Sequence, residues 1–155
     1  MINCTFENGD KASLRHVTVV AIARNKEGKI LLTKRAPHLL RGGKWTVPGG
    51  FLDRDENTSE GIKREIEEET GLAASEVTLF RVNDRERSKE DRQNVDFIFL
   101  AVVDGELKKD TETIGFKWID EKTLPPDEEF AFDHRESILK YFEHLKEPLQ
   151  LPIIG

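Results

Sequence analysis

The residues best suited to chemistry in this chain lie in one acidic segment, residues 55–69. The segment holds seven acidic residues and two basic ones, Lys63 and Arg64. Its acidic residues are Asp55, Glu56, Glu60, Glu65, Glu67, Glu68 and Glu69. Such crowding raises electrostatic repulsion unless positive charge offsets it. The segment is therefore either the solvated face of a helix or a site that binds cations.

Residues 58–70 have the pattern of an amphipathic helix. Asn57 or Thr58 can cap its N-terminus, because either side chain can accept a hydrogen bond from the free N–H groups of the first turn. Gly71 stands where a left-handed residue is needed to end a helix. We therefore expect a helix over 58–70, which is long enough to set the spacing of its glutamates.

Three glutamates of this helix, Glu65, Glu68 and Glu69, share one arc, because positions three and four apart lie on the same face. Glu69 also falls inside the apolar stripe that Ile62 and Ile66 define. A buried carboxylate costs several kcal/mol unless it is paired or binds a metal. Carboxylate oxygens are the ligands that Mg²⁺ and Mn²⁺ prefer. We predict a divalent-cation site on this arc.

Glycines next to the helix indicate close approach of the backbone. Gly49 and Gly50 follow Pro48, and their carbonyl groups could add oxygen ligands. Gly61 lies inside the helix, where glycine costs about 1 kcal/mol relative to alanine. Either a loop or substrate needs room beside Gly61, or the helix packs tightly there against a sheet, and the sequence leaves both readings open.

Strands and a second helix must position this segment. Apolar or alternating runs predict strands, and Gly, Pro and Asn mark the turns between them. The expected strands cover 16–23, 29–35, 45–47, 76–83, 94–103 and 115–119, with a break at 48–50 and a charged loop over 84–92. The second helix is expected over 134–146, with a capping box of Asp133 and Glu136, a buried stripe of Ile138, Leu139, Phe142 and Leu145, and an irregular tail after Pro148. This order indicates a mixed α/β domain.

The composition fits a single globular domain of 155 residues with a net charge of −6. That charge argues against non-specific nucleic-acid binding. No apolar run approaches the roughly 20 residues that cross a bilayer, and the first residues lack the core of a signal peptide. Cys4 is the one cysteine, so neither an internal disulfide nor a thiolate zinc site is expected. A cytosolic setting is the default expectation.

The acidic segment resembles a known family motif. Gly50, five residues, Glu56, seven residues and then 64–72 (REIEEETGL) match every fixed position of the Nudix box, G-x5-E-x7-R-E-U-x-E-E-x-G-U, where U is aliphatic. The order of the flanking strands and the closing helix is similar to that family over nearly the whole chain. The resemblance implies one Nudix hydrolase domain over 1–155 with its box at 50–72. It also implies an α/β/α sandwich with a mixed sheet, and hydrolysis of a nucleoside diphosphate linked to another moiety.

The resemblance also implies roles for individual residues. Glu65, Glu68 and Glu69 would hold Mg²⁺ or Mn²⁺ together with the Gly50 carbonyl, while Arg64 and Glu56 would orient the glutamates. The general base varies within the family. One of the box glutamates or a later acid such as Glu112 could serve here.

Substrate contacts are less sharply indicated. Arg35 and Arg41 lead the candidates for binding phosphate, because a guanidinium binds phosphate with two hydrogen bonds, although a single residue of this kind is more often a surface charge. The other cations considered are Lys34, Lys44 and Arg54. A stacking partner for a base is sought among Phe51, Phe97, Phe116 and Phe132, all of which could instead belong to the core. His134 could touch a ligand or simply begin the second helix.

The segment 130–139 (FAFDHRESIL) is similar to a tail found in Nudix proteins of the ADP-ribose and NAD-metabolism branch. This favours ADP-ribose or a related nucleotide sugar as substrate. Ser88 stands where many ADP-ribose members have proline, and the one tyrosine, Tyr141, lies in the last helix, so neither subgroup signature is met. A nucleoside triphosphate hydrolase and a non-catalytic nucleotide sensor remain the alternatives. The partners implied are a small nucleotide, no nucleic acid, no membrane and a possible homodimer.

Overall fold

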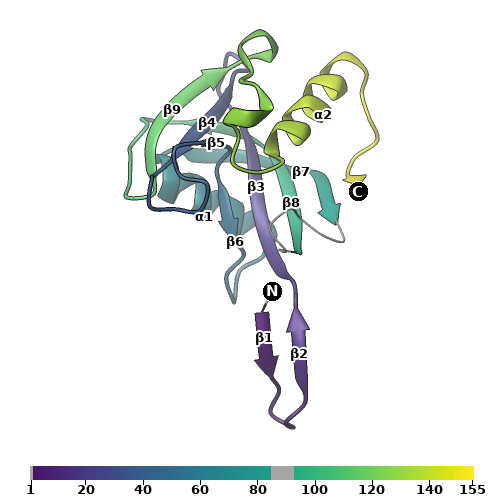
Figure 1. Ribbon diagram of the computed structural model, residues 1–155. Helices are drawn as coiled ribbons and strands as arrows, with labels where there is room; N and C mark the ends of the chain where they lie inside the picture. Colours follow the sequence, from purple (N-terminus) through teal and green to yellow (C-terminus); the bar gives the residue numbers. More distant parts are fainter. Residues whose placement is uncertain (1, 85–92) are drawn as a thin grey trace.

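Strand β3 (His16–Arg24) is the central strand of the computed structural model, which describes residues 2–84 and 93–155. It pairs in parallel with β8 (Asn94–Asp104), and β8 pairs antiparallel with β7 (Ala73–Asp84). On its other side β3 begins a hairpin with β4 (Ile30–Arg35). The sheet follows the order β10-β7-β8-β3-β4-β5, with β6 on β3 and β9 on β4 (Figure 1). The remaining bounds are β5 Trp45–Thr46, β6 Gly49–Phe51, β9 Thr113–Ile119 and β10 Ile153–Ile154.

The sheet forks between β3 and β4. The two strands share the single registered pair Arg24↔Ile30, and farther along β3 its partner is β6, where Val20 faces Gly49 and Val19 faces Gly50. The predicted break at 48–50 is confirmed at Pro48, which lies between β5 and β6, whereas Gly49 and Gly50 join the sheet as a short strand. The fork brings the backbone of Gly49 and Gly50 beside the acidic helix.

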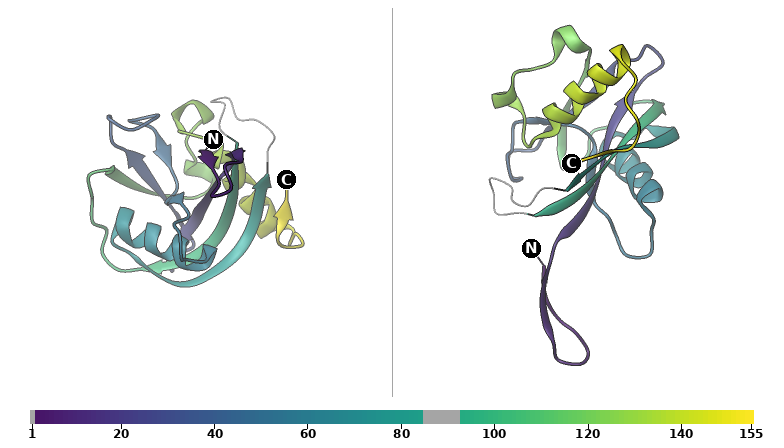
Figure 2. Two further views of the ribbon diagram at one scale, coloured as in Figure 1. Left: turned by 90° about the horizontal axis from the view of Figure 1, so that it is seen from below. Right: turned by 90° about the vertical axis from the view of Figure 1, so that its right-hand side faces the viewer.

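Two helices cover opposite faces of the sheet, as the two views of Figure 2 show. Alternate residues of β3 supply two separate cores: Val19 and Ala21 pack with Ile62 and Ile66 of α1 (Thr58–Thr70), while the neighbouring Val20 and Ile22 pack under α2 (His134–Lys146). This alternation follows from the two-residue period of a strand. The α/β/α sandwich with a mixed sheet is confirmed.

Helix α1 forms over the residues expected from the sequence. Asn57 is its N-cap and forms a capping box with Glu60, and Gly71 ends it with φ 72°. Ile62 and Ile66 are fully buried, which contributes about 1.5–3 kcal/mol each. Since both apolar anchors face the sheet, the rotation of the helix is fixed, and so is the direction of each glutamate.

Helix α2 has the expected bounds but a different N-terminus and a different buried face. The Asp133 side chain makes no capping hydrogen bond, so the predicted capping box is wrong. Its carboxylate instead accepts a hydrogen bond from Asn83 at 3.4 Å. Half of the predicted apolar stripe is confirmed. Ile138 and Phe142 are buried, whereas Leu139 and Leu145 are exposed.

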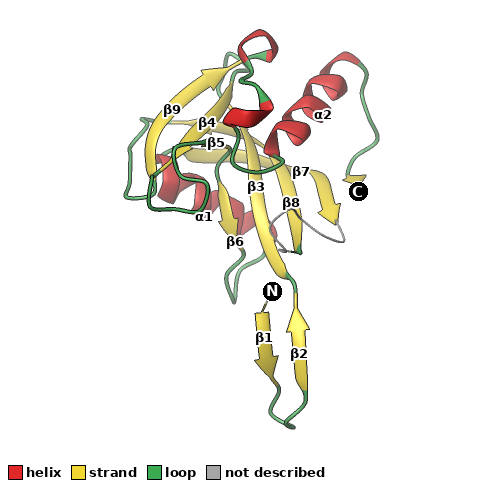
Figure 3. Ribbon diagram, viewed as in Figure 1, coloured by secondary structure: helices red, strands yellow, loops and turns green. Residues whose placement is uncertain are grey.

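Besides β6, three short strands were not predicted. The hairpin β1 (Ile2–Thr5) and β2 (Lys11–Leu14) projects away from the rest of the fold (Figures 1 and 3). The tail after Pro148 is not wholly irregular, because β10 pairs with β7. Asp84 ends β7, while the rest of the predicted charged loop, 85–92 with Ser88, lies outside the described residues. No helix over 2–84 and 93–155 has the length and apolar character needed to span a membrane.

Candidate active site

Arg64 of α1 is the centre of the acidic cluster. Its Nε and Nη2 donate to the two oxygens of Glu56, at 3.0 and 2.8 Å. Nη1 donates to Glu65 at 2.8 Å and to Glu68 at 3.0 Å. Nη2 also reaches the carbonyl oxygen of Phe51 at 3.1 Å. One guanidinium thus fixes three carboxylates of the box and ties the helix to the end of β6.

These contacts set the charge states of the outer part of the cluster. The hydrogen bonds from Arg64, and next the backbone N–H of Asp53, lower the pKa of Glu56 to about 2. The same carboxylate, together with Glu65 and Glu68, raises the pKa of Arg64 above its ordinary value. Glu56 and Arg64 therefore form a permanently ionised pair, which is suited to holding other groups in place.

Glu69 lies deeper, and no arginine or lysine of residues 2–84 and 93–155 forms an ion pair with it. Burial raises the pKa of Glu69 to about 8; the N–H of Gly49, which donates to it at 3.2 Å, opposes this. The charge of Glu65 raises the pKa of Glu69 further, Arg35 lowers it and Asp110 raises it. Burial also raises the pKa of Glu65. The surrounding protein groups therefore do not fully offset the negative charge of ionised Glu69.

The two glycines of β6 are required by these contacts. A Cβ atom at Gly50 would stand 2.5 Å from Oε1 of Glu65, and one at Gly49 would stand 2.3 Å from the carbonyl oxygen of Val19. Gly49 also has a φ of 152°, a backbone conformation that residues with a side chain rarely adopt. Gly50 therefore allows Glu65 to lie directly against the β6 backbone, and Gly49 allows β6 to lie close to β3.

Gly61 has a similar explanation. A Cβ atom there would stand 2.8 Å from Glu56 Oε1 and 2.8 Å from Leu52 Cδ1. Room beside Gly61 is therefore taken by the loop that carries Glu56. The structure therefore favours the interpretation that Gly61 leaves room for a loop over the interpretation that it allows tight packing against the sheet.

The three predicted metal ligands do not form a closed trio. Glu65 and Glu68 meet on Arg64, while Glu69 points to Gly49, and within 2–84 and 93–155 no three Asp, Glu, His or Cys side chains group closely enough to hold a metal ion. The donor set still fits a divalent cation. Its ligands are carboxylate oxygens, and the half-buried Glu69 forms no ion pair with a cation of the described residues.

The predicted cationic contacts differ in position. Arg35 is half-buried: its Nε donates to the Leu40 carbonyl at 2.9 Å, and its Cζ lies 5.2 Å from the centre of the Phe132 ring. Arg41 is exposed in the loop after β4. Lys34 lies over the Trp45 ring, Lys44 donates to the Glu128 carbonyl and Arg54 pairs with Asp55. Arg35 is the one among them whose charge acts on Glu69.

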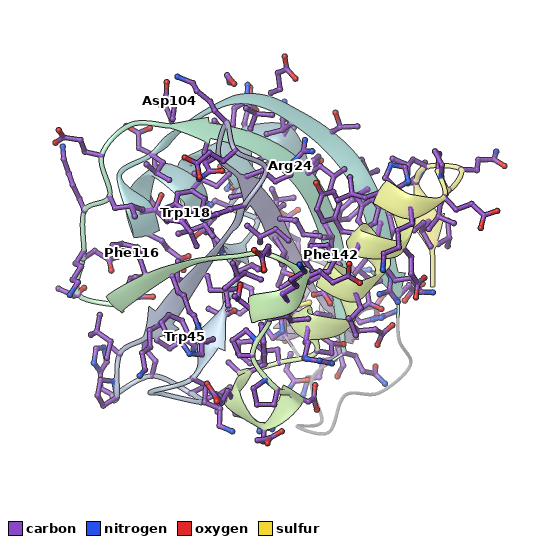
Figure 4. The ribbon with its side chains drawn as sticks, turned by 90° about the horizontal axis from the view of Figure 1, so that it is seen from above. Arg24, Trp45, Asp104, Phe116, Trp118 and Phe142 are labelled. Carbon is purple, nitrogen blue, oxygen red and sulfur yellow. The ribbon has the colours of Figure 1, made fainter. Side chains whose placement is uncertain are left out.

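The predicted aromatic contacts also divide. Phe51 follows Gly50 and is 50% exposed, with the His16 ring 5.0 Å away, so it is accessible beside the box. Phe116 packs against the core on the α1 side, as does Phe97, and Figure 4 shows Phe116 with Trp118 along β9. Phe51 therefore keeps the position of a ligand contact, whereas Phe116 has the position of a packing residue.

Glu112, predicted as a later acid of the site, is exposed, and its backbone N–H donates to Asp110 at 2.9 Å. Asp110, two residues earlier, is the acid whose charge acts on Glu69. Glu112 therefore stays a prediction, and Asp110 is a second acid of the same segment. The spacing within a loop gives no signal that distinguishes the two.

The pH dependence of stability should report the buried glutamate. Because the folded-state pKa of Glu69 is about 8, against 4.5 as the ordinary value, the folded protein binds more protons than the unfolded chain between these values. The free energy of unfolding of the metal-free protein should therefore contain a contribution that falls as pH rises from about 4.5 to about 8. Urea unfolding at several pH values should show this decline in the wild type and a weaker one in Glu69→Gln. Equal slopes in both proteins would contradict the assignment.

Fold and geometry together define a small α/β/α domain in which an acid-rich helix lies against a glycine-containing strand. The NUDIX domain profile matches residues 14–141. The chain therefore belongs to the Nudix hydrolase family.

Relatives support this assignment. An ADP-ribose pyrophosphatase of Methanocaldococcus jannaschii is 34% identical over 117 residues, which cover 75% of this chain and 67% of that protein. A NUDIX hydrolase from Nitrosomonas europaea has a TM-score of 0.78 at 24% identity, covering 99% of this chain and 92% of that one, and so shares the fold. This chain spans about two thirds of the length of the archaeal relative, and less than half of the mammalian 8-oxo-dGDP phosphatases that it also resembles.

A third relative is relevant to the metal. A bifunctional NMN adenylyltransferase/ADP ribose pyrophosphatase from Francisella tularensis, complexed with AMP and a Mn ion, has a TM-score of 0.65 at 25% identity. The match covers 84% of this chain and 42% of that one. That protein thus combines this fold with a nucleotide and a divalent metal.

Proposed function

We propose that this protein is a Mg²⁺- or Mn²⁺-dependent pyrophosphohydrolase that cleaves a nucleoside diphosphate linked to another moiety, with ADP-ribose or a related nucleotide sugar as substrate. The observation that carries the proposal is Glu69, an under-compensated carboxylate held against the Gly49 N–H at the centre of a complete box. A group of this kind is suited to a cation and has no evident structural use.

In this proposal the box residues divide the work. Glu65, Glu68 and Glu69, with the carbonyl of Gly50, would hold the cations. When bound, divalent cations supply a water molecule of lowered pKa and offset the charge of the phosphates. Arg64 keeps Glu65 and Glu68 in place, since it donates to both, and its ion pair with Glu56 anchors it.

Arg35 at the end of β4 and the exposed Phe51 of β6 would contact the substrate. Arg35 has a fixed guanidinium, because Leu40 accepts from its Nε, and its remaining N–H groups can donate to phosphate oxygens. Arg41 could add a second positive charge from its loop. The proposal keeps Phe51 as a stacking surface and gives Phe116 no contact with substrate.

The substrate class rests on the relatives. The name of the Methanocaldococcus relative and that of the Francisella protein both favour ADP-ribose. A second candidate is hydrolysis of damaged nucleotides, because a putative 8-oxo-dGTP diphosphatase of Bacillus subtilis is 34% identical over 105 residues. Both candidates use the same box chemistry, so a direct comparison of substrates must decide between them.

A substrate panel tests the proposal. The protein is incubated with Mg²⁺ and ADP-ribose, nucleotide sugars, dinucleoside polyphosphates, or ordinary and oxidised nucleoside triphosphates, and the products are identified by mass. We expect AMP and ribose 5-phosphate from ADP-ribose at the highest kcat/KM. Preference for an oxidised triphosphate would support the second candidate. Absence of turnover on every member would overturn the proposed activity.

A further inference from the structure

The hairpin of β1 and β2 has one apolar and one polar face. Alternate residues of a strand point to opposite sides, and the cross-strand pairs follow this alternation. The apolar pairs are Ile2–Leu14 and Cys4–Ala12, and the polar pairs are Asn3–Ser13 and Thr5–Lys11. Phe6 extends the apolar side, because its N–H donates to the Asp10 carbonyl at 2.8 Å and so adds one more pair to the ladder. We call Ile2, Cys4, Phe6, Ala12 and Leu14 the apolar face.

The apolar face lies outside both cores of the domain. Figures 1 and 2 show the hairpin extending beyond the sheet, clear of the two helices. Over residues 2–84 and 93–155, the two apolar clusters include none of the residues of this face. Ile2, Phe6 and Leu14 are 44%, 50% and 43% exposed. A two-stranded hairpin without further packing is marginally stable in water, so the face needs a partner from outside the chain.

Arg15 holds the hairpin in one direction relative to the domain. Its side chain donates to the carbonyl oxygens of Gln93 at 3.3 Å and Asn94 at 2.8 Å, and to the Asp84 carboxylate. These groups lie where β7 ends and β8 begins. The match to the family profile begins at residue 14, so the hairpin is an addition to the shared domain. A projection fixed in this way can dock with little further loss of conformational freedom.

The apolar face carries both a projecting ring and a recess. Phe6 stands at the tip, and Ile2 and Leu14 stand at the base. Between them lie two small residues, Cys4 and Ala12. A groove of about 410 Å³ follows this middle part and is lined by Asn3, Cys4, Thr5, Lys11, Ala12 and Ser13. Large side chains pack best opposite small ones, so the face is complementary to a second copy of itself.

The distribution of charge also favours a second copy. Residues 2–15 contain two acidic and two basic side chains, so their net charge is zero, whereas the whole chain has a net charge of −6. Those four side chains are Glu7, Asp10, Lys11 and Arg15. The rest of the chain therefore carries the whole excess of negative charge, which opposes contact between two copies. The hairpin is the part through which two copies can approach without that repulsion.

We propose that the apolar face is the surface through which two copies of this chain associate, with Phe6 of each copy on Cys4 and Ala12 of the other. The two hairpins would stack antiparallel about 10 Å apart, like the sheets of a small sandwich. Two strands of four residues offer well below the roughly 800 Å² per partner of a stable interface. We therefore expect a dimer in equilibrium with the monomer. This inference does not depend on the proposed function.

The association is tested by light scattering over a range of protein concentrations. The mass of the wild type should rise from 17.8 kDa towards twice that value as the concentration increases. Cys4 is the one cysteine of the chain, so its reaction with a thiol reagent reports whether the recess is covered. The rate constant of that reaction should fall over the same range of concentrations.

Two variants test the packing of the ring in the recess. Phe6→Ser removes the ring and should weaken association by about tenfold or more, as the loss of a central aromatic contact does. Ala12→Leu fills the recess and should weaken association similarly, although it adds apolar surface. In both variants Cys4 should react at the monomer rate throughout the range in which the wild type is protected.

Leu145→Ser is the matched control, because Leu145 is an apolar residue of α2 that is 57% exposed and lies far from the hairpin in the sequence. This variant should associate like the wild type, and thermal unfolding checks that each variant is folded. A wild type that stays monomeric at every concentration would overturn the inference, and so would wild-type association of both hairpin variants. Capture of a different protein by a monomeric wild type would also count against it.

Discussion

Glu69→Gln is expected to lower kcat/KM by about 100-fold or more, the usual loss when a preorganised electrostatic contact to a transition state is removed. Glutamine has the shape of glutamate and can still accept the hydrogen bond from Gly49. It cannot supply the negative charge that holds a cation. Because burial already favours the protonated, uncharged form of Glu69, the fold should survive, and thermal unfolding should show an unchanged or higher midpoint.

Glu67→Gln is the control for this change. Glu67 lies on the same helix but is exposed, and it lies outside the hydrogen-bond network of Arg64. Its replacement removes the same charge from the segment and should leave kcat/KM within about twofold, as is usual for surface substitutions. Near-wild-type turnover of Glu69→Gln, in a folded protein, would reject Glu69 as a ligand.

The second large expected effect is a complete loss of activity when divalent cations are removed. The substrate is an anionic diphosphate and the site is rich in carboxylates, so without cations the two repel each other. Activity should disappear after treatment with a chelator and return when Mg²⁺ or Mn²⁺ is added in excess. Full activity in the chelator-treated protein would contradict the proposed cofactor.

Cation binding should also be visible without substrate. Glu69 must lose its proton before it can bind a metal, and burial raises its pKa to about 8. Mg²⁺ should therefore raise the melting temperature more at pH 8 than at pH 6. The increase should be much smaller in Glu69→Gln, whereas Glu67→Gln should respond like the wild type.

The spacing of apolar residues in the sequence was sufficient to predict the elements of the fold that bury them. The stripe of Ile62 and Ile66 predicted both helix α1 and the buried position of Glu69, because burial of apolar surface dominates local geometry. The capping residues Asn57 and Gly71 followed from local hydrogen bonding and φ requirements.

Contacts between distant segments could not be predicted in this way. The sequence suggested that Asp133 caps its own helix, but its carboxylate instead accepts a hydrogen bond from Asn83, 50 residues away. Nothing in the spacing indicated that Gly49–Phe51 would form β6, because its partner residues lie in β3. The hairpin β1–β2 has short strands whose pairing gives a weak signal. Such outcomes depend on tertiary packing, which local propensity does not encode.

The most direct test of the central claim is a high-resolution crystal structure of the protein with Mn²⁺ and a non-hydrolysable nucleotide analogue, in which anomalous scattering locates the metal. We predict Mn²⁺ bound to Glu65, Glu68 and Glu69 and to the analogue's phosphates, with Arg64 retaining Glu56. Manganese bound elsewhere, with Glu65 and Glu68 still on Arg64 and Glu69 still on Gly49, would contradict it.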